Sequence, residues 1–465
     1  MPCRFAESSR TLFGMETSAI AGATARAREW SEVRPGSAPG ASAAPKPINK
    51  RLLYAALFLV AFALRFAFML WKHTYLPPVP DAAVPFGPEV CTIARHIVEG
   101  KGFSTPFFGA DTGPTAWIAP VYPYMVAAVF LIFGIYTPAS AIVILGLQCM
   151  MAGATSISIY ALGARSMGAR VGLWAAWIWA VSPFFFRWPV LWIWDFTASA
   201  LLMSVAMVTA IDVAEKGTLG LWLRMGAIWA LMALTNPALL SVMPFTFAYA
   251  AYVNHKAGVK WIRPLVYSGV LLAALVSPWL IRNYVVFHQP VFFRSNYWFE
   301  FHLGNYHFSN GMGFSGKHPN GNPAILREYA KKGELRFIAD AKQDAFRFVR
   351  EDTAEFLDLS AHRAWWFWDG TMLLFHANEW WTPREYAVLS WAGWLGLLFV
   401  VTRRPKGWIL FAAALVVYPI PYYLSYPNQK YRHAIEPELL LLGVYFVFVL
   451  WGEVTGRFAL RRTAQ

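Results

Sequence analysis

Apolar residues in this chain are grouped into long runs separated by polar loops. The run at 52–72, LLYAALFLVAFALRFAFMLWK, is long enough to cross a bilayer, because a transmembrane helix needs about 20 mostly apolar residues. The pattern predicts an all-α polytopic membrane protein with about ten transmembrane helices. The further apolar runs are 138–162, 171–187, 190–211, 219–235, 238–253, 265–281, 386–402, 408–424 and 437–451.

The run at 118–134, IAPVYPYMVAAVFLIFG, fits either a span or a helix along the membrane interface. If it lies along the interface, four loops that together hold ten Lys and Arg face the cytoplasm, whereas the short outer loops hold three. A span here would reverse this count, against the positive-inside rule. We therefore expect an interfacial helix and two cytoplasmic termini. The four positive loops are 163–170, 212–224, 254–263 and 403–406.

The polar segments divide the chain into four parts. Residues 1–50 are rich in Ala, Gly, Ser, Pro and Arg and are expected to form a flexible cytoplasmic tail. Residues 51–281 form an N-terminal transmembrane module that includes a first periplasmic loop at 73–137, and 282–385 form a large periplasmic loop. Residues 386–465 supply the C-terminal transmembrane helices and a short cytoplasmic tail. Long loops in compact folds are usually functional.

Both outer loops contain amphipathic helical patterns. In the first, Pro88 suits a helix start and Gly100 a helix stop, with Glu89 in the first turn, where the helix dipole favours a carboxylate. The second has a helical period over 334–351, which we expect to rest on the membrane surface. The apolar face of the first helix is formed by Val90, Ile93, Ala94, Ile97 and Val98.

Composition supports a membrane protein. Hydrophobic residues make up 57% of the chain and charged residues 14%, whereas soluble domains carry about 25% charge. The net charge of +14 fits cytoplasmic loops and anionic lipid headgroups, and no motif points to nucleic acid. Cys3, Cys91 and Cys149 follow no metal-binding spacing, so we expect neither a disulfide nor a zinc site.

A series of motifs in the first outer loop resembles that of a known superfamily. After the first apolar run come an acidic residue, an Ile-Ala-Arg helix at 93–95, Gly-Lys-Gly-Phe at 100–103, Pro-Val-Tyr-Pro-Tyr at 120–124 and Phe-Gly at 133–134. This order resembles the first periplasmic loop of GT-C glycosyltransferases, which use polyprenyl-phosphate-linked sugars and include protein mannosyltransferases and aminoarabinose transferases. The resemblance extends to Arg65, to Asp195 in RWPVLWIWDF, and to SPWLIRNYVVF and KYRHAIEP.

The resemblance implies a glycosyltransferase of the inner membrane. It would move a sugar from a polyprenyl-phosphate donor to a lipid, glycan or protein acceptor at the periplasmic face. The family's loop acid is catalytic, and many members carry it where this chain has Phe86. Glu89 lies one helical turn later and is our first candidate, with Asp81 and Asp111 as alternatives.

The chemistry of such a reaction needs a base and positive charge. Phosphate leaves without a general acid, so a carboxylate that accepts the acceptor's proton suffices, and displacement with one base inverts the anomeric centre. Asp195, flanked by Trp and Phe near the bilayer, is the second candidate acid, because a charge there is costly unless paired or used. Whether Glu89 and Asp195 share a divalent metal ion is left open.

Several cationic side chains could bind the donor phosphate. Charge-assisted hydrogen bonds from Arg, Lys or His would hold it at the membrane face, and the planar fork of Arg suits phosphate best. Snorkelling and lipid-headgroup binding are the alternative roles for these residues. The candidates are Lys430, Arg432 and His433, which lie within four residues, Arg282 with its neighbour Asn283, Arg294, and Arg65 if it reaches outward.

Two other functional classes remain. A transporter or flippase of a lipid-linked sugar would also need apolar helices and cationic outer patches, but transporters usually show inverted repeats and ionisable groups at the bilayer midplane. The concentration of candidate polar groups on one face favours surface chemistry over passage through the membrane. A noncatalytic subunit of an envelope complex is the third class.

Overall fold

A computed structural model of the chain describes residues 49–76, 87–313, 315–370 and 383–463. The chain divides into two units, residues 1–50 and residues 51–465, and the second unit contains the helical bundle. Residues 1–48 of the tail expected at 1–50, together with Asp81 and Phe86, lie outside the described residues. Within them every regular element is a helix, apart from one isolated bridge between Ser104 and Pro114, so the all-α prediction is confirmed.

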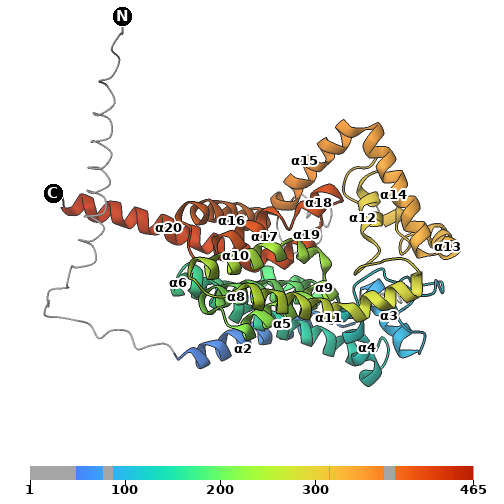
Figure 1. Cartoon of the computed structure of the whole chain (residues 1–465), viewed down its shortest axis with the longest axis horizontal. Coiled ribbons are helices and arrows are strands. Elements are labelled where there is room, and N and C mark those ends of the chain that lie inside the picture. The colour runs from blue at the N-terminus through green and yellow to red at the C-terminus, as the bar shows by residue number, and fades with distance from the viewer. Residues whose placement is uncertain (1–48, 77–86, 314, 371–382, 464–465) are drawn as a thin grey trace, which may run out of the picture. The chain divides into compact units, whose positions relative to one another are not determined.

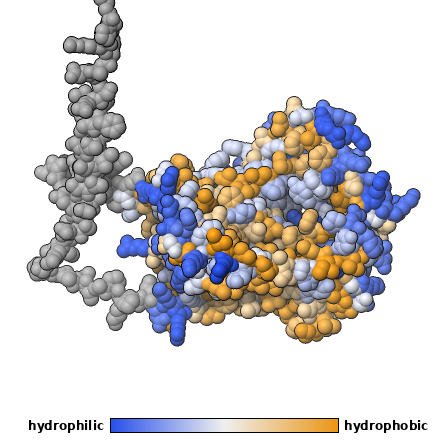
Figure 2. All heavy atoms as spheres, in the orientation of Figure 1, coloured by the Kyte–Doolittle hydropathy of each residue, from blue (hydrophilic) through white to orange (hydrophobic). Residues whose placement is uncertain are grey.

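Among the described residues, six helices are long and apolar enough to cross a membrane. Figure 1 shows them side by side, and Figure 2 shows a hydrophobic surface over this bundle with hydrophilic residues at both ends. The six are α2 (Lys50–Lys72), α5 (Pro138–Ser166), α8 (Phe196–Lys216), α11 (Ile262–Phe287), α16 (Pro383–Arg403) and α20 (Glu436–Thr463). Shorter helices in the bundle are α6 (Ala169–Val181), α9 (Leu219–Thr235), α10 (Met243–Lys256), α17 (Trp408–Val416) and α18 (Ile420–Leu424).

The positively charged loops meet at one end of this bundle. Arg165 Nε lies 3.2 Å from Asp212 Oδ1, and Lys406 Nζ lies 2.8 Å from Glu215 Oε1. The Asn254 side-chain amide donates a hydrogen bond of 2.9 Å to the carbonyl of Val213. These contacts place the loops after α5, α8, α10 and α16 on the same side.

The opposite end carries the outer helices, which are coloured from blue to orange in Figure 1. Two of them have the bounds that their amphipathic patterns predict, since α3 spans Pro88–Val98 with Glu89 in its first turn and α14 spans Glu334–Glu351. The others are α7 (Arg187–Leu191), α12 (Tyr297–Gly304), α13 (Pro323–Lys332), α15 (Thr353–Asp369) and α19 (Gln429–Arg432).

Two features near this outer end bear on the expected spans. Helix α4 spans Val121–Phe133, which is about 20 Å at 1.5 Å per residue and too short for a bilayer core of about 30 Å. Its length fits the interfacial position expected for 118–134. Helix α8 begins at Phe196 rather than at residue 190, because 187–191 form α7 and 192–195 an irregular turn. Asp195 therefore lies outside the long helix.

Candidate functional site

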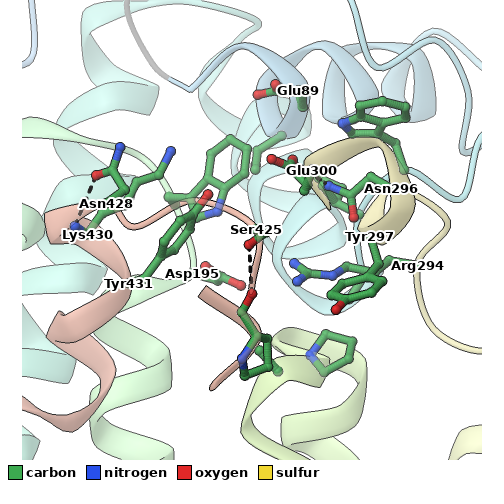
Figure 3. Close-up of a pocket in the computed structure, with 18 of the residues that line it drawn as sticks. Glu89, Asp195, Arg294, Asn296, Tyr297, Glu300, Ser425, Asn428, Lys430 and Tyr431 are labelled. Atoms are coloured by element: carbon green, nitrogen blue, oxygen red, sulfur yellow. Dashed lines mark hydrogen bonds between the residues drawn. The ribbon is translucent and has the colours of Figure 1, made fainter. Parts of the chain in front are cut away.

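A cavity of about 790 Å³ opens at the outer end of the bundle. Its wall is made by the start of α3, the turn before α8, the segment that leads into α12, and the segment between α18 and α19. Figure 3 shows Glu89, Asp195 and Glu300 facing one space, with Arg294 on one side and Lys430 on the other. Four of these five residues were candidates from the sequence.

Glu89 is held at the N-terminus of α3. Asn320 Nδ2 donates a hydrogen bond of 2.9 Å to its Oε1, and His318 Nε2 lies 3.6 Å from the same oxygen. Burial raises the pKa of Glu89, opposed by the charges of His318 and Lys430. Gly87, just before the helix, has a φ of 82°, and a Cβ there would lie 2.3 Å from the carbonyl oxygen of Ile193. Only glycine allows this close approach between Glu89's helix and the Asp195 turn.

Asp195 ends a turn that Gln148 of α5 holds in place. The Gln148 amide donates to the carbonyls of Pro189 and Trp192 at 2.9 and 3.1 Å, and its oxygen accepts from the Trp194 amide at 3.2 Å. Asp195 Oδ1 is buried and has no hydrogen-bond donor within the described chain. Burial raises the pKa of Asp195 to about 7, against the opposing charges of Arg294 and Lys430. Such a carboxyl can gain or lose a proton near neutral pH.

Arg294 and Lys430 are the two cations of the cavity wall whose charge is open to a ligand. Neither forms an ion pair with a carboxylate in the part of the chain that the structure describes. Lys430 Nζ lies 5.9 Å from the ring centre of Trp194, 5.8 Å from that of Phe196 and 5.3 Å from that of Tyr431. An anionic group that enters the cavity would find both cations available.

Glu300, a third carboxylate of the wall, was not expected from the sequence. It accepts a hydrogen bond of 3.0 Å from Asn296 Nδ2 and one of 2.7 Å from the hydroxyl of Tyr426. The hydroxyls of Tyr426 and Tyr431 lie 3.1 Å apart. The position of Glu300 in an aromatic stretch, YWFEFHLG, gave no signal for this network.

Glu334, also not expected, joins the two outer loops beside the cavity. Its carboxylate accepts from the Ala116 amide at 2.8 Å, from the Ser295 hydroxyl at 2.7 Å, from the Tyr329 hydroxyl at 2.8 Å and from Thr115 Oγ1. Burial raises the pKa of Glu334, and these four hydrogen bonds oppose the rise. Trp117 and Arg294 of the wall are next in sequence to residues in this cluster, so Glu334 fixes their backbone.

Arg432 and His433 do not line the cavity with Lys430. Arg432 is fully buried, with Nη2 3.2 Å from Glu436 Oε1 and Nη1 donating to Ser390 Oγ at 2.6 Å. His433 Nδ1 lies 2.7 Å from Glu436 Oε2. The expected cluster of three phosphate-binding groups is therefore reduced to Lys430, because the other two are engaged in an ion-pair network inside the bundle.

The remaining candidates, Arg282 with its neighbour Asn283 and Arg65, donate hydrogen bonds to backbone carbonyl groups. Arg282 donates to the carbonyls of Thr115 and Phe103, both at 2.7 Å, while Asn283 donates to that of Val291 at 3.0 Å. Arg65 is fully buried and donates to backbone carbonyls rather than reaching outward.

Asp111, the alternative acid within the described chain, accepts hydrogen bonds from the Thr105 hydroxyl at 2.9 Å and the Gly113 amide at 3.2 Å. The hydrogen bond from Thr105, followed by that from Gly113, lowers the pKa of Asp111. It stabilises a turn and is not part of the cavity wall.

Metal binding finds no support in the grouping of donor side chains. Across residues 49–76, 87–313, 315–370 and 383–463, no three His, Cys, Asp or Glu side chains are placed together to hold a metal ion. Cys91 and Cys149 are separate buried thiols. The described residues therefore assign no metal site.

Comparison with known families adds a sequence match. Residues 117–281 match the model of the family described as dolichyl-phosphate-mannose-protein mannosyltransferase. The matched segment runs from the cavity wall at Trp117 to α11 and contains Asp195. Over this segment the expected resemblance to GT-C glycosyltransferases is confirmed. Among curated proteins, no sequence matches the chain significantly.

Several solved structures are similar at low identity. The archaeal oligosaccharyltransferase AglB from Archaeoglobus fulgidus, in complex with an inhibitory peptide and a dolichol-phosphate, is 13% identical with a TM-score of 0.49, and the match covers 90% of this chain and 52% of that one. ArnT from Cupriavidus metallidurans, bound to undecaprenyl phosphate, is 12% identical with a TM-score of 0.34 and coverages of 85% and 77%. The chain spans about half the length of the archaeal enzyme.

Proposed function

We propose that this protein is a GT-C glycosyltransferase that moves a sugar from a polyprenyl-phosphate donor to a lipid, glycan or protein acceptor. One observation carries the proposal: Glu89, Asp195, Arg294 and Lys430, which are far apart in the sequence, line one cavity. The cavity is at the end of the bundle opposite the positively charged loops. By the positive-inside rule this is the periplasmic face of the inner membrane. The match of residues 117–281 to a mannosyltransferase family supports the same reaction class.

The donor phosphate binds to Arg294 and Lys430. Both cations lie close enough to Asp195 to lower its pKa, so their positive charge is directed into the same part of the cavity. Charge-assisted hydrogen bonds from these side chains neutralise the charge that grows on the phosphate as the sugar leaves. The guanidinium of Arg294 suits two phosphate oxygens at once, whereas Lys430 acts as a point charge.

Glu89 serves as the base. The oxygen of an acceptor hydroxyl attacks the anomeric carbon, the bond from that carbon to the phosphate oxygen breaks, and the phosphate leaves with the bonding electron pair. The acceptor's proton moves to the Glu89 carboxylate. Asn320 fixes one carboxylate oxygen and thereby orients the group. Asp195, whose Oδ1 is buried without a partner, is available to accept a hydrogen bond from the acceptor and so to orient it.

Substitution of the two acids tests this proposal. In proteoliposomes supplied with radiolabelled polyprenyl-phosphate sugars, Glu89→Gln should abolish transfer, a loss of at least about 100-fold because general-base catalysis contributes about 10²–10⁴. Asp195→Asn should reduce transfer by a smaller factor, because Asp195 is not the base. Glu328→Gln, which makes the same chemical change at an exposed residue of α13, is the matched control. Turnover by Glu89→Gln at the wild-type rate would reject the role of this residue.

The same assay separates the transferase from a flippase and reports the stereochemistry. A flippase would move the labelled donor across the bilayer without forming a new glycosidic bond. A transferase with one base and no covalent intermediate gives a product with the inverted anomeric configuration, which NMR of the product detects. A retained configuration would require a nucleophile among the cavity carboxylates.

A further inference from the structure

We propose that Asn296, Glu300, Tyr426 and Tyr431 form a subsite that recognises the hydroxyl groups of a sugar ring and excludes sugars that carry a carboxylate. The inference rests on the proposed function, because it names the chemistry of the group that the cavity receives. All four residues line the cavity, two from α12 and its start and two from the segment before α20. The sugar belongs either to the donor or to a glycan acceptor.

The two sides of this subsite are fixed against each other by close backbone packing. A Cβ on Gly304, at the end of α12, would lie 1.9 Å from the carbonyl oxygen of Ser425. Arg363 of α15 donates from Nη1 to Leu424 O at 3.1 Å and to Asn305 Oδ1 at 3.0 Å. The distance between α12 and residues 424–431 is therefore set by contacts outside the subsite. Such rigid support is what a recognition site requires.

The two tyrosine hydroxyls donate their protons in a fixed order, from Tyr431 to Tyr426 and from Tyr426 to Glu300. Glu300, as a carboxylate, is an acceptor only, so the hydroxyl of Tyr426 donates its single proton to Glu300 Oε2 at 2.7 Å. In the contact of 3.1 Å between the two hydroxyls, Tyr431 must then be the donor and Tyr426 the acceptor. Tyr431 is left with free lone pairs on its hydroxyl oxygen and no proton to offer.

Asn296 presents a second unmatched acceptor. Its Nδ2 donates to Glu300 Oε1 at 3.0 Å, which fixes the orientation of the amide because the opposite orientation would place two oxygens together. Oδ1 then faces away from Glu300, is buried, and has no donor within the described chain, and the side chain is 5% exposed. A buried acceptor without a partner is unfavourable, and a hydrogen bond from a ligand O–H would remove this penalty.

The chemistry on this side of the cavity therefore consists of acceptors, and it selects a ligand rich in donors. Sugar hydroxyls meet this requirement, whereas a uronic acid would place a second negative charge beside Glu300. Arg294 and Lys430 both lower the pKa of Asp195, and Lys430 Nζ lies 5.3 Å from the ring centre of Tyr431, so the phosphate-binding cations border this group of acceptors. The cavity thus combines a cationic part for phosphate with an acceptor-lined part for the sugar.

Binding of three lipids by the purified protein in nanodiscs tests the subsite. The probes are polyprenyl phosphate, polyprenyl-phosphate mannose and polyprenyl-phosphate glucuronic acid. We expect wild-type protein to bind the mannose lipid at least about 10-fold more tightly than the sugar-free lipid, and the glucuronic acid lipid no more tightly than the sugar-free one. Glu300→Gln, Asn296→Ala and Tyr431→Phe should each reduce the mannose advantage several-fold. Retained binding of the sugar-free lipid shows that a variant is folded, and Glu328→Gln is the matched control.

A second arm identifies the source of the sugar. Protein saturated with sugar-free lipid phosphate is titrated with methyl mannoside. If the variants weaken this binding but keep the mannose-lipid advantage, the subsite receives the acceptor glycan. If they remove the lipid advantage, it receives the donor sugar. If the variants change neither the advantage of the mannose lipid nor the binding of methyl mannoside, the inference is overturned. Sugar binding by a wild-type protein that transfers no label would reject the proposed function and leave the subsite.

Discussion

The backbone amide of Ala116 donates a hydrogen bond of 2.8 Å to the carboxylate of Glu334, although the two residues are 218 positions apart. In the same region the amide of Ser295 donates to the carbonyl of Ala116 at 2.8 Å. The first outer loop and the large outer segment are thus bound to each other through backbone groups. The cavity wall owes its shape to this connection, because Trp117 and Arg294 extend from it.

Replacing Glu334 with glutamine should destabilise the outer segment. All four of its partners are donors, so the amide group of glutamine would place an N–H against at least one of them. Hydrogen bonds to charged groups contribute about 1.5–3 kcal/mol each, and we expect a loss of about 2 kcal/mol. The folded fraction after graded heating in detergent measures it. Glu351→Gln, at an exposed residue of α14, is the control, and equal stability of the two variants would contradict the role.

The transfer rate should depend on pH through the carboxylates. Burial raises the pKa of Glu89 and takes that of Asp195 to about 7, so the rate should rise with pH as each carboxyl loses its proton, with the step from Asp195 near pH 7. Lys430 lowers both pKa values, so Lys430→Met should move the acidic limb to higher pH. The profile of kcat against pH measures the shift. Lys332→Met, which alters an exposed lysine, should leave the limb in place.

Lys430 and Arg432 should respond differently to substitution. Lys430→Met removes a cavity cation without breaking an ion pair, so folded protein should form and the KM for the donor should rise about 10-fold or more. Arg432→Ala leaves the buried Glu436 with one cationic partner fewer, a change that costs about 3–5 kcal/mol, and should lower the yield of folded protein.

The double variant Arg432→Ala with Glu436→Gln tests whether Arg432 acts as a structural partner of Glu436 or as a phosphate-binding residue. Partial recovery of folded protein is expected, because the neutral amide at position 436 needs no counter-charge. If folded Arg432→Ala accumulated normally and only its donor affinity fell, a direct role in phosphate binding would be restored.

Compartment labelling tests the sidedness of the molecule. Cysteines introduced at Lys101 and Arg336 should react with a membrane-impermeant maleimide from one side of the membrane, and a cysteine at Lys216 only from the other. Cys3 is first replaced by serine, and Cys91 and Cys149 are buried and should contribute little background. Reaction of positions 101 and 336 from opposite sides would contradict a shared outer cavity.

Local periodicity was sufficient to predict several elements. The apolar face of 88–98 and that of 334–351 gave the bounds of α3 and α14, because each pattern repeats within a single helix. Charge counting indicated that the first outer loop and the segment at Lys430 share one side. The meeting of Glu89 with Lys430 at one cavity follows from that arrangement.

Contacts between distant segments could not be predicted in the same way. Glu300 is 126 positions from Tyr426, and no local pattern relates them. The turn that ends at Asp195 was expected to be part of a span because its Trp residues are apolar. Its conformation is fixed by hydrogen bonds with Gln148 of α5, a contact that no local pattern predicts. For Arg432 a local signal did exist, since Glu436 four residues later is the spacing of an ion pair within a helix.

Arg65 restricts how the bundle could open. Its guanidinium donates to the carbonyls of Trp179 at 2.7 Å and Ala180 at 3.1 Å, and thereby fastens α2 to the end of α6. Separating these two helices would leave a cation and carbonyl groups without hydrogen-bond partners in the hydrocarbon region, at a cost of several kcal/mol. If the proposed donor lipid enters from the membrane, we therefore expect its tail to pass between a different pair of helices.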